Sequence, residues 1–236
     1  MMINSLDRRS LQGLIVSCQA PPDSPLHHPS VIAAMAKAAL NQGATAVRID
    51  TPTHIQAVRQ QTDAPIIGLW KRQFPDSEIY ITPQFDQALE LAQAGADWIA
   101  IDATNRPRPG GETLETLITQ IHQQLNKPVF ADVDTLESAN VAFQAGADLL
   151  ATTLYGYTPQ TQDLTPPGYD LLEQLVQQFS CPIVCEGGIA SPEMAQNALD
   201  LGAMAVVVGT DITGIDQKVK SYQQILSTAK SVRYAE

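Results

Sequence analysis

Short apolar runs recur along the chain, and each is separated from the next by a stretch with helical spacing of hydrophobic residues. Eight such runs begin near residues 13, 46, 65, 98, 128, 149, 182 and 204. They are apolar throughout instead of alternating with polar residues, which is typical of strands buried on both faces of a parallel sheet. Consecutive runs begin about 27 residues apart, which leaves room for one helix after each strand.

Four helix tails share one pattern in which a Gly-Ala pair is followed at once by an apolar run. The glycines are Gly43, Gly95, Gly146 and Gly202. Glycine commonly closes a helix because it adopts the left-handed conformation at little steric cost. We therefore predict that each of these glycines ends a helix and leads the chain directly into a buried strand.

Helix starts are also marked in the sequence. Ser191 followed by Pro192 suits an N-cap and the first helical position, Thr135 precedes an apolar stripe, and a third helix is expected after Pro29 and Ser30. The two proline-rich stretches at 20–29 and 158–167 follow the first and sixth strands and are predicted to be long loops that could wall a site.

Strands that alternate with helices predict an α/β protein with a parallel sheet covered by helices. No linker divides the chain, so we expect one domain spanning residues 1–236. A (β/α)8 TIM barrel, which typically has about 250 residues, fits this length and strand count. A doubly wound open sheet is the alternative.

The composition excludes several classes of partner. The net charge of −11 should repel nucleic acid and anionic membranes. The chain has no apolar stretch long enough to cross a membrane and no signal peptide, so we expect a cytoplasmic protein with no membrane partner. Its three cysteines form no C-x-x-C pair, and neither a disulfide framework nor a metal site is expected.

Polar residues gather at one end of the predicted strands. In barrel enzymes the carboxyl ends of the strands carry the chemistry. Here those ends are polar whereas the strand starts are proline, alanine or apolar residues, and the polar set is Gln19, Arg48, Asp50, Lys71, Arg72, Asp102, Asp132, Asp134, Thr152, Thr153, Glu186, Gly209 and Thr210.

Lys71 and Glu186 are the candidate catalytic residues within this set. The alternation of a strand points Lys71 towards the barrel axis and Arg72 outside or into a salt bridge. Arg48 on the adjacent strand and partial burial should lower the pKa of Lys71 and favour a neutral amine that can act as a base. Glu186 lies four strands away, so it should face Lys71 across the barrel. Asp50 and Asp134 lie further into loops.

For Asp50 and Asp134 we expect exposure to solvent or helix capping, not chemistry.

A phosphate cradle is predicted elsewhere, at the seventh and eighth strands. Two glycines and a helix start follow the seventh strand, and Gly-Thr follows the eighth, which are features that bind phosphate in many barrels. The predicted phosphate-binding residues are Gly187, Gly188, Gly209 and Thr210.

Several motifs together resemble a known family. In order and spacing, "GLIVSCQ", "VRID", "PIIGLWKR", "IDATNRPRP", "ADVDT", "TTLYGYT" and "CEGG" are similar to bacterial N-acetylmannosamine-6-phosphate 2-epimerases of sialic acid catabolism, from about residue 11 to residue 225. The resemblance implies a TIM-barrel enzyme that needs no cofactor and interconverts N-acetylmannosamine 6-phosphate and N-acetylglucosamine 6-phosphate. The expected partner is thus a phosphorylated amino sugar.

The resemblance also implies roles for individual residues. Lys71 and Glu186 match the family's catalytic lysine and glutamate, and the substrate-binding positions match Gln19, Arg48, Asp132 and Arg106. We include Thr153, at the end of the sixth strand, in the substrate-binding set. One departure concerns Gly188, because many family members carry a basic residue directly after Glu-Gly. The absence of this basic residue should weaken phosphate binding more than it changes the reaction.

Two other functions remain open at this stage. Lys71 could form a Schiff base in an aldolase or lyase, or the protein could sense a sugar phosphate without turning it over. For the epimerase, ring opening would expose an aldehyde and acidify the C2 proton, which Lys71 would exchange while Glu186 assists. Whether one base serves both faces of C2 or two bases share them stays open. A helix over residues 217–230 could form a homodimer contact.

Overall fold

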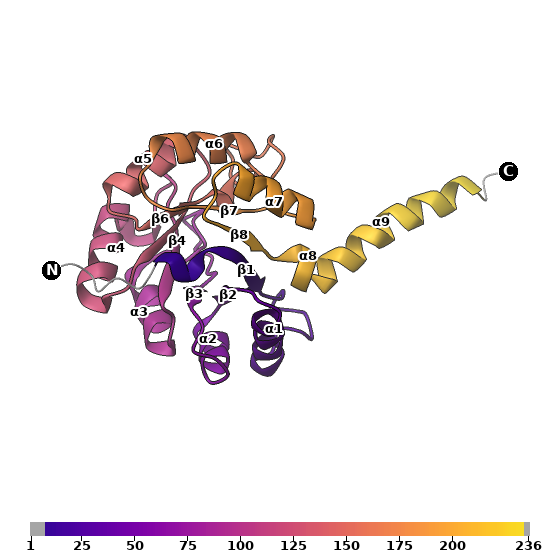
Figure 1. Cartoon of the computed structure of the whole chain (residues 1–236), viewed down its shortest axis with the longest axis horizontal. Coiled ribbons are helices and arrows are strands. Elements are labelled where there is room, and N and C mark those ends of the chain that lie inside the picture. The colour runs from indigo at the N-terminus through magenta and orange to yellow at the C-terminus, as the bar shows by residue number, and fades with distance from the viewer. Residues whose placement is uncertain (1–7, 234–236) are drawn as a thin grey trace.

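A computed structural model describes residues 8–233 of the chain. Eight parallel strands form a closed barrel in sequence order, surrounded by helices (Figure 1). The first strand, β1 (Gly13–Cys18), pairs with both β2 (Ala46–Asp50) and β8 (Ala205–Val208). This closure confirms the predicted TIM barrel and excludes the open sheet. The predicted domain range, 1–236, extends beyond the described residues at both ends.

The strands begin within one residue of the predicted positions. The remaining five are β3 (Ile66–Leu69), β4 (Trp98–Asp102), β5 (Val129–Asp132), β6 (Leu149–Ala151) and β7 (Ile183–Glu186). Pro65, Pro128 and Pro182 each stand immediately before a strand. Because proline has no N–H to donate to the ladder, the strand begins at the following residue.

Helices on the outside of the barrel connect consecutive strands (Figure 1). They are α1 (Pro29–Asn41), α2 (Pro52–Arg59), α3 (Phe85–Ala94), α4 (Leu114–Gln120), α5 (Leu136–Gln144), α6 (Tyr169–Gln178) and α7 (Pro192–Asp200). Two more helices, α8 (Thr210–Thr213) and α9 (Ile215–Arg233), follow the last strand. Shorter helical turns are η1 (Arg8–Leu11), η2 (Pro109–Gly111), η3 (Ile121–Leu125) and η4 (Thr152–Leu154).

Alternation along the strands divides the core into two layers. One layer fills the barrel and includes Ile67, Trp98 and Phe130, and the other packs the strands against the helices and includes Val47 and Ile99. All five side chains are almost completely buried. The strands are therefore apolar throughout because both of their faces are covered.

The helix ends follow the predicted glycine pattern. Gly43, Gly95, Gly146 and Gly202 all adopt φ between 97° and 106°, which L-amino acids other than glycine rarely reach. The predicted N-caps are confirmed as well, since Ser191 accepts a hydrogen bond from Met194 N and Thr135 accepts one from Ser138 N. Helix α1 begins at Pro29 and not after Ser30, because the His28 side chain caps it.

Two carboxylates at the amino-terminal end of the barrel join neighbouring strands. Asp97, just before β4, accepts a hydrogen bond from Ile66 N at 2.9 Å, and Asp148, just before β6, accepts one from Val129 N at 2.8 Å. Each carboxylate satisfies the N–H at the start of the preceding strand, which the ladder leaves unpaired. These contacts fix the strand register at the end of the barrel opposite to the predicted site.

Helix α9 extends away from the barrel, so most of its length has no neighbouring helix within the described chain (Figure 1). It covers the helix predicted for residues 217–230. Among residues 8–233, no helix is both long and apolar enough to cross a membrane.

Candidate active site

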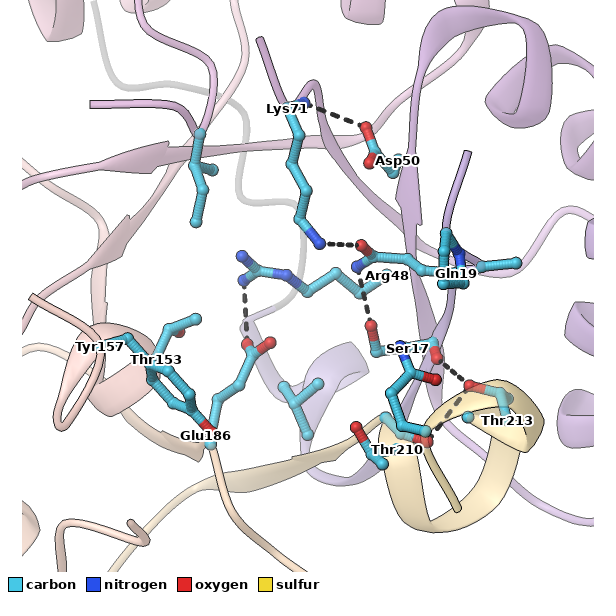
Figure 2. Close-up of a pocket in the computed structure, with 18 of the residues that line it drawn as sticks. Ser17, Gln19, Arg48, Asp50, Lys71, Thr153, Tyr157, Glu186, Thr210 and Thr213 are labelled. Carbon is cyan, nitrogen blue, oxygen red and sulfur yellow. Dashed lines mark hydrogen bonds and ion pairs between the residues drawn. The ribbon is translucent and has the colours of Figure 1, made fainter. Parts of the chain in front are cut away.

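A cavity of about 470 Å³ opens at the carboxyl ends of the strands (Figure 2). Most of the predicted site residues line it, namely Gln19, Arg48, Lys71, Thr153, Glu186, Gly187, Gly188, Gly209 and Thr210. Asp132 and Arg106 do not belong to this lining. The barrel thus brings together side chains that are as much as 191 positions apart in the printed sequence, from Gln19 to Thr210.

Lys71 lies just beyond β3 and reaches into the cavity. Its backbone N–H donates to Asp50 Oδ1 at 3.1 Å, and its Nζ donates to Gln19 Oε1 at 2.6 Å. Burial by the surrounding protein lowers the pKa of Lys71, and the nearby Arg48 cation lowers it further, against the opposing charges of Asp50 and Glu186. The predicted direction of the shift is confirmed, and the neutral amine becomes more accessible.

Arg48 occupies the centre of the site and is almost completely buried. Its two terminal nitrogens donate to Asp132 at 3.0 and 2.6 Å, and Nη1 lies 2.9 Å from Glu186 Oε2. Burial lowers the pKa of Arg48, but the charges of Asp132 and Glu186 together raise it above its ordinary value. Arg48 therefore stays a cation next to any negative charge that forms in the pocket.

Glu186 ends β7 on the wall opposite Lys71 (Figure 2). Its side chain is 12% exposed. Burial raises the pKa of Glu186 to about 7, the Asp132 carboxylate contributes in the same direction, and the Arg48 cation opposes the rise. Near neutral pH the carboxyl group can thus exist in either protonation state, as a group that both donates and accepts protons must.

Asp132 lies beneath Arg48 and not in the cavity wall. It is completely buried, and its oxygens accept hydrogen bonds from Arg48 and from Thr153 Oγ1, the latter at 2.6 Å. Sequence analysis placed Asp132 in contact with substrate. Asp132 holds Arg48 and Thr153, which face the cavity, and its contact with substrate stays a prediction.

Arg106 lies beside Asp102, at the end of β4. Its Nη2 donates to Asp102 Oδ2 at 2.6 Å and its Nε donates to Thr104 Oγ1 at 3.0 Å. Arg106 is not part of the cavity lining, and contact between Arg106 and a sugar stays a prediction. Arg72 lies outside as expected, with its guanidinium over the rings of Trp70 and Phe74.

The four residues predicted to bind phosphate lie together at the edge of the cavity. Gly187 and Gly188 have φ values of 101° and 70°, and within residues 8–233 their N–H groups donate no hydrogen bond. Two consecutive residues of this kind leave unpaired N–H donors at the edge of the cavity. Gly209 and Thr210 line the cavity beside them.

The surroundings of Gly188 explain why this position carries no basic side chain. A Cβ atom at this position would lie 2.6 Å from Pro166 Cβ and 2.7 Å from its carbonyl carbon. Pro166 belongs to the proline-rich loop 158–167, which packs directly against the glycine. A basic side chain at position 188 is therefore incompatible with this loop conformation.

Two expectations about carboxylates were wrong. Asp50 was expected to be exposed or to cap a helix, but it is half-buried, lines the cavity and accepts the Lys71 N–H. Asp134 is 1% exposed and accepts hydrogen bonds from the hydroxyls of Ser138 and Thr158, so it joins α5 to loop 158–167. Neither role could be predicted from the sequence, because Lys71 is 21 positions from Asp50 and Thr158 is 24 positions from Asp134.

Three further residues that carry hydroxyl groups line the cavity and were not predicted from the sequence. They are Ser17, Tyr80 and Tyr157. Ser17 and Tyr157 lie within quoted motifs, and the strand alternation that pointed Lys71 inward also places Ser17 on the same face as Gln19. Tyr80 belongs to a loop, for which no comparable periodicity exists.

The chain is similar to a family and to individual proteins of that family. Residues 32–228 match the family model described as "Putative N-acetylmannosamine-6-phosphate epimerase". Two proteins that carry the name "Putative N-acetylmannosamine-6-phosphate 2-epimerase", from Synechococcus elongatus and Thermosynechococcus vestitus, are 57% and 62% identical to this chain. The matches cover 93% and 89% of this chain and 96% and 91% of their own lengths.

Solved structures show the same relationship. The N-acetylmannosamine-6-phosphate 2-epimerase of Clostridium perfringens superimposes with a TM-score of 0.88 at 41% identity, covering 92% of this chain and 94% of the other. Thiamine phosphate pyrophosphorylase of Pyrococcus furiosus has a TM-score of 0.58 at 20% identity over 95% of this chain and 98% of the other. The second similarity shows a shared fold alone.

Proposed function

The chain belongs to the N-acetylmannosamine-6-phosphate epimerase family, and we propose that its cavity inverts C2 of N-acetylmannosamine 6-phosphate to give N-acetylglucosamine 6-phosphate. The family relationship favours this carbohydrate epimerase over the Schiff-base aldolase and the sensor. One observation about the site supports it most. Lys71 and Glu186 enter one cavity from opposite walls, with the Arg48 cation between them (Figure 2).

The reaction requires an open-chain sugar. The two compounds differ in configuration at C2, and the C2 hydrogen becomes acidic only when C1 is an aldehyde. Removal of that proton leaves an enolate, whose negative charge is shared between C2 and the C1 oxygen. Return of a proton to the opposite face of C2 completes the inversion, so no net electron transfer occurs.

Lys71 is the group that we assign to the C2 proton. Its lowered pKa makes the neutral amine available, and a neutral amine is a sufficiently strong base for a carbon acid next to a carbonyl. Arg48 remains charged and lies where it can stabilise the enolate oxygen on C1. Because Arg48 is already fixed by Asp132, it needs little reorganisation when the charge develops.

Glu186 is assigned to ring opening and to the second proton transfer. With its pKa raised to about 7, it can donate a proton to the ring oxygen and take one back from a hydroxyl group at neutral pH. Whether Glu186 or Lys71 returns the proton to C2 depends on the face of the sugar that each addresses. Gln19 and Thr153 would hydrogen-bond the acetamido and hydroxyl groups.

The phosphate group would bind at the edge of the cavity that Gly187, Gly188, Gly209 and Thr210 form. The support for this placement is the set of unpaired N–H groups next to the start of α7. No Lys or Arg side chain lines this part of the cavity among the described residues. Phosphate would thus be held by backbone N–H and hydroxyl donors alone.

Deuterium incorporation tests the proposed reaction. Incubation of N-acetylmannosamine 6-phosphate with the protein in heavy water should give N-acetylglucosamine 6-phosphate labelled at C2, as read by NMR. Conversion without label at C2 would exclude a proton-transfer route. Failure to convert this sugar, combined with tight binding, would favour the sensor, and borohydride trapping of a Lys71 adduct would favour the aldolase.

A homodimer formed through α9 completes the proposal. Along this helix, Ile215, Val219, Tyr222 and Leu226 recur at helical spacing, and their exposed fractions are 54% to 69%. Contiguous exposed apolar residues usually mark a binding surface. We assign this α9 stripe to contact with a second copy of the chain. The cytoplasmic location and the absence of affinity for nucleic acid stay predictions from the sequence.

A further inference from the structure

Lys71 belongs to a chain of hydrogen bonds that runs across the cavity floor. Its Nζ donates to Gln19 Oε1 at 2.6 Å, and Gln19 Nε2 donates to Ser17 Oγ at 2.8 Å (Figure 2). Gln19 is thus held at both ends of its amide group. Ser17 is the last side chain in this series of hydrogen bonds, and the sequence motifs assign it no role.

Ser17 is the fixed end of the chain of hydrogen bonds. It lies in β1, directly opposite Arg48 in the strand register, and is 7% exposed. Its carbonyl oxygen accepts a hydrogen bond from Thr213 Oγ1 at 2.8 Å. On the other side, a Cβ atom at Gly209 would lie 3.3 Å from Ser17 Cβ, so β8 closely approaches the serine. Ser17 therefore cannot shift to follow a moving Gln19.

The Gln19 amide has two inequivalent ends, and only one arrangement suits the lysine. The carbonyl oxygen accepts a hydrogen bond from the side-chain amine of Lys71, whereas the NH2 group can only donate. Ser17 Oγ accepts from this NH2 group and so keeps the carbonyl oxygen directed at Lys71. With one N–H of the amine fixed in this way, the lone pair of the neutral amine has a defined direction.

We propose that Ser17 is a positioning residue for the proton transfer, because it holds the Gln19 amide and through it directs the Lys71 amine at the substrate carbon. The inference rests on the proposed function. It adds a third residue to the machinery of the base, although Ser17 need not touch the reacting atoms. Since Ser17 Oγ accepts from Gln19, its own O–H hydrogen is free to donate to a substrate oxygen, which would reinforce the same orientation.

Loss of the Ser17 hydroxyl should have two kinetic consequences. Ser17→Ala should lower kcat for C2 deuterium exchange about tenfold, with a change in KM of less than about threefold. The substitution disturbs the orientation of the Lys71 amine more than it disturbs substrate binding. It should also move the Lys71 limb of the pH profile to lower pH. A hydrogen bond from Lys71 to a fixed Gln19 oxygen favours the charged amine, so its loss lowers the pKa of Lys71.

The other groups around Lys71 are unchanged by this substitution. The charges that act on it are those of Asp50, Arg48, Glu186 and Asp132. None of these four side chains accepts a hydrogen bond from the Ser17 hydroxyl or donates one to it. A shift of the Lys71 limb in Ser17→Ala would thus report on Gln19, whereas a purely structural role of Ser17 would leave it in place.

Three further variants complete the experiment. Ser17→Thr keeps a hydroxyl and should restore both kcat and the pH profile, and Ser17→Cys, a poorer acceptor of similar size, should give an intermediate result and replaces Ser17→Ala if that variant does not fold. Ser221→Ala, on the exposed face of α9, serves as the control that should match the wild type.

The outcomes separate this inference from the proposed function. If wild-type protein labels C2 but Ser17→Ala and Ser17→Cys keep the wild-type kcat and pH limb, Ser17 does not position the base and the inference fails. A Ser17→Thr variant as impaired as Ser17→Ala would also overturn it. Absence of C2 label in the wild type would overturn the proposed function itself.

Discussion

The guanidinium of Arg48 lies 2.9 Å from the carboxyl group of Glu186 and also donates two hydrogen bonds to Asp132. One cation is thus shared by two carboxyl groups. It stabilises negative charge on both but does not fully compensate for the burial of Glu186, whose pKa rises to about 7. The balance leaves Glu186 able to lose or gain a proton at neutral pH and keeps Arg48 charged.

Replacement of Lys71 should remove the proton transfer. We expect Lys71→Ala to reduce C2 deuterium exchange by at least about 10³-fold, in the range that a general base contributes. NMR of the labelled sugar would measure the loss. Arg72→Ala is the matched control, because Arg72 lies over Trp70 and Phe74 outside the cavity and should keep its activity within about twofold. Equal losses in the two variants would remove Lys71 from the mechanism.

Glu186 should make folding stability depend on pH. Burial raises its pKa from 4.5 to about 7, so between these values the folded protein keeps a proton that the unfolded chain has released. Its contribution to stability is complete below pH 4.5 and is lost as the pH rises through 7. Urea unfolding should show a loss of at most about 3 kcal/mol across this interval from this group.

The Glu186→Gln variant has no titrating group at this position, so this part of the pH dependence should disappear. Glu173→Gln, on the exposed side of α6, is the control and should retain the wild-type dependence. Glu186→Gln should also slow C2 exchange at neutral pH by about 10²-fold or more, because the amide transfers no proton. A wild-type stability curve in Glu186→Gln would contradict the assignment.

Asp132 should act through Arg48 and not through substrate affinity. Asp132→Asn removes one of the two charges that compensate the buried guanidinium, and we expect a stability loss of roughly 3 kcal/mol. Because Asp132 also raises the pKa of Glu186, the Glu186 limb of the pH profile should move to lower pH. Steady-state kinetics should give a lower kcat with KM little changed. A raised KM at unchanged kcat would instead support the contact with substrate that the sequence predicted.

A cation at position 188 should impair the protein instead of improving phosphate binding. In Gly188→Arg the new Cβ would overlap Pro166, and the φ of 70° would be strained for any side chain. We expect a loss of about 2 to 4 kcal/mol in unfolding free energy and a raised KM. Gly43→Ala, where φ is 97° and no atom lies within 4 Å of the new Cβ, measures the backbone strain alone. A lower KM in Gly188→Arg would contradict this account.

The α9 stripe should control association. Replacement of Tyr222 by Asp, or of both Val219 and Leu226 by Asp, places charge within an apolar contact and should convert a dimer into a monomer. Sedimentation or light scattering would measure the mass. Lys220→Asp, on another side of the same helix, is a control whose change in charge is at least as large. A wild-type protein that is monomeric at micromolar concentration would refute the dimer.

The sequence predicted the barrel well because its strands are buried on both faces. The apolar runs are short and do not alternate with polar residues, and a proline before three of them marks the start to within one residue. The left-handed glycines Gly43 and Gly202 were equally predictable, since few other residues tolerate that conformation.

The site was predicted only in part, because alternation gives a direction but not a depth. Lys71 and Gln19 were placed correctly at the cavity, whereas Asp132 was expected there and lies beneath Arg48. Arg48 and Asp132 both point inward, but Arg48 lines the cavity and Asp132 does not. Contacts between loops, such as Pro166 against Gly188, have no periodicity at all and could not be predicted.

The carboxylates Asp97 and Asp148 anchor strands at the end of the barrel that lies furthest from catalysis. Chain segments at the other rim can consequently be exchanged or lengthened in the laboratory without loosening these anchors. A library confined to the rim loops should yield folded proteins at a high rate, and the scaffold offers a practical starting point for acting on sugars with other acyl groups.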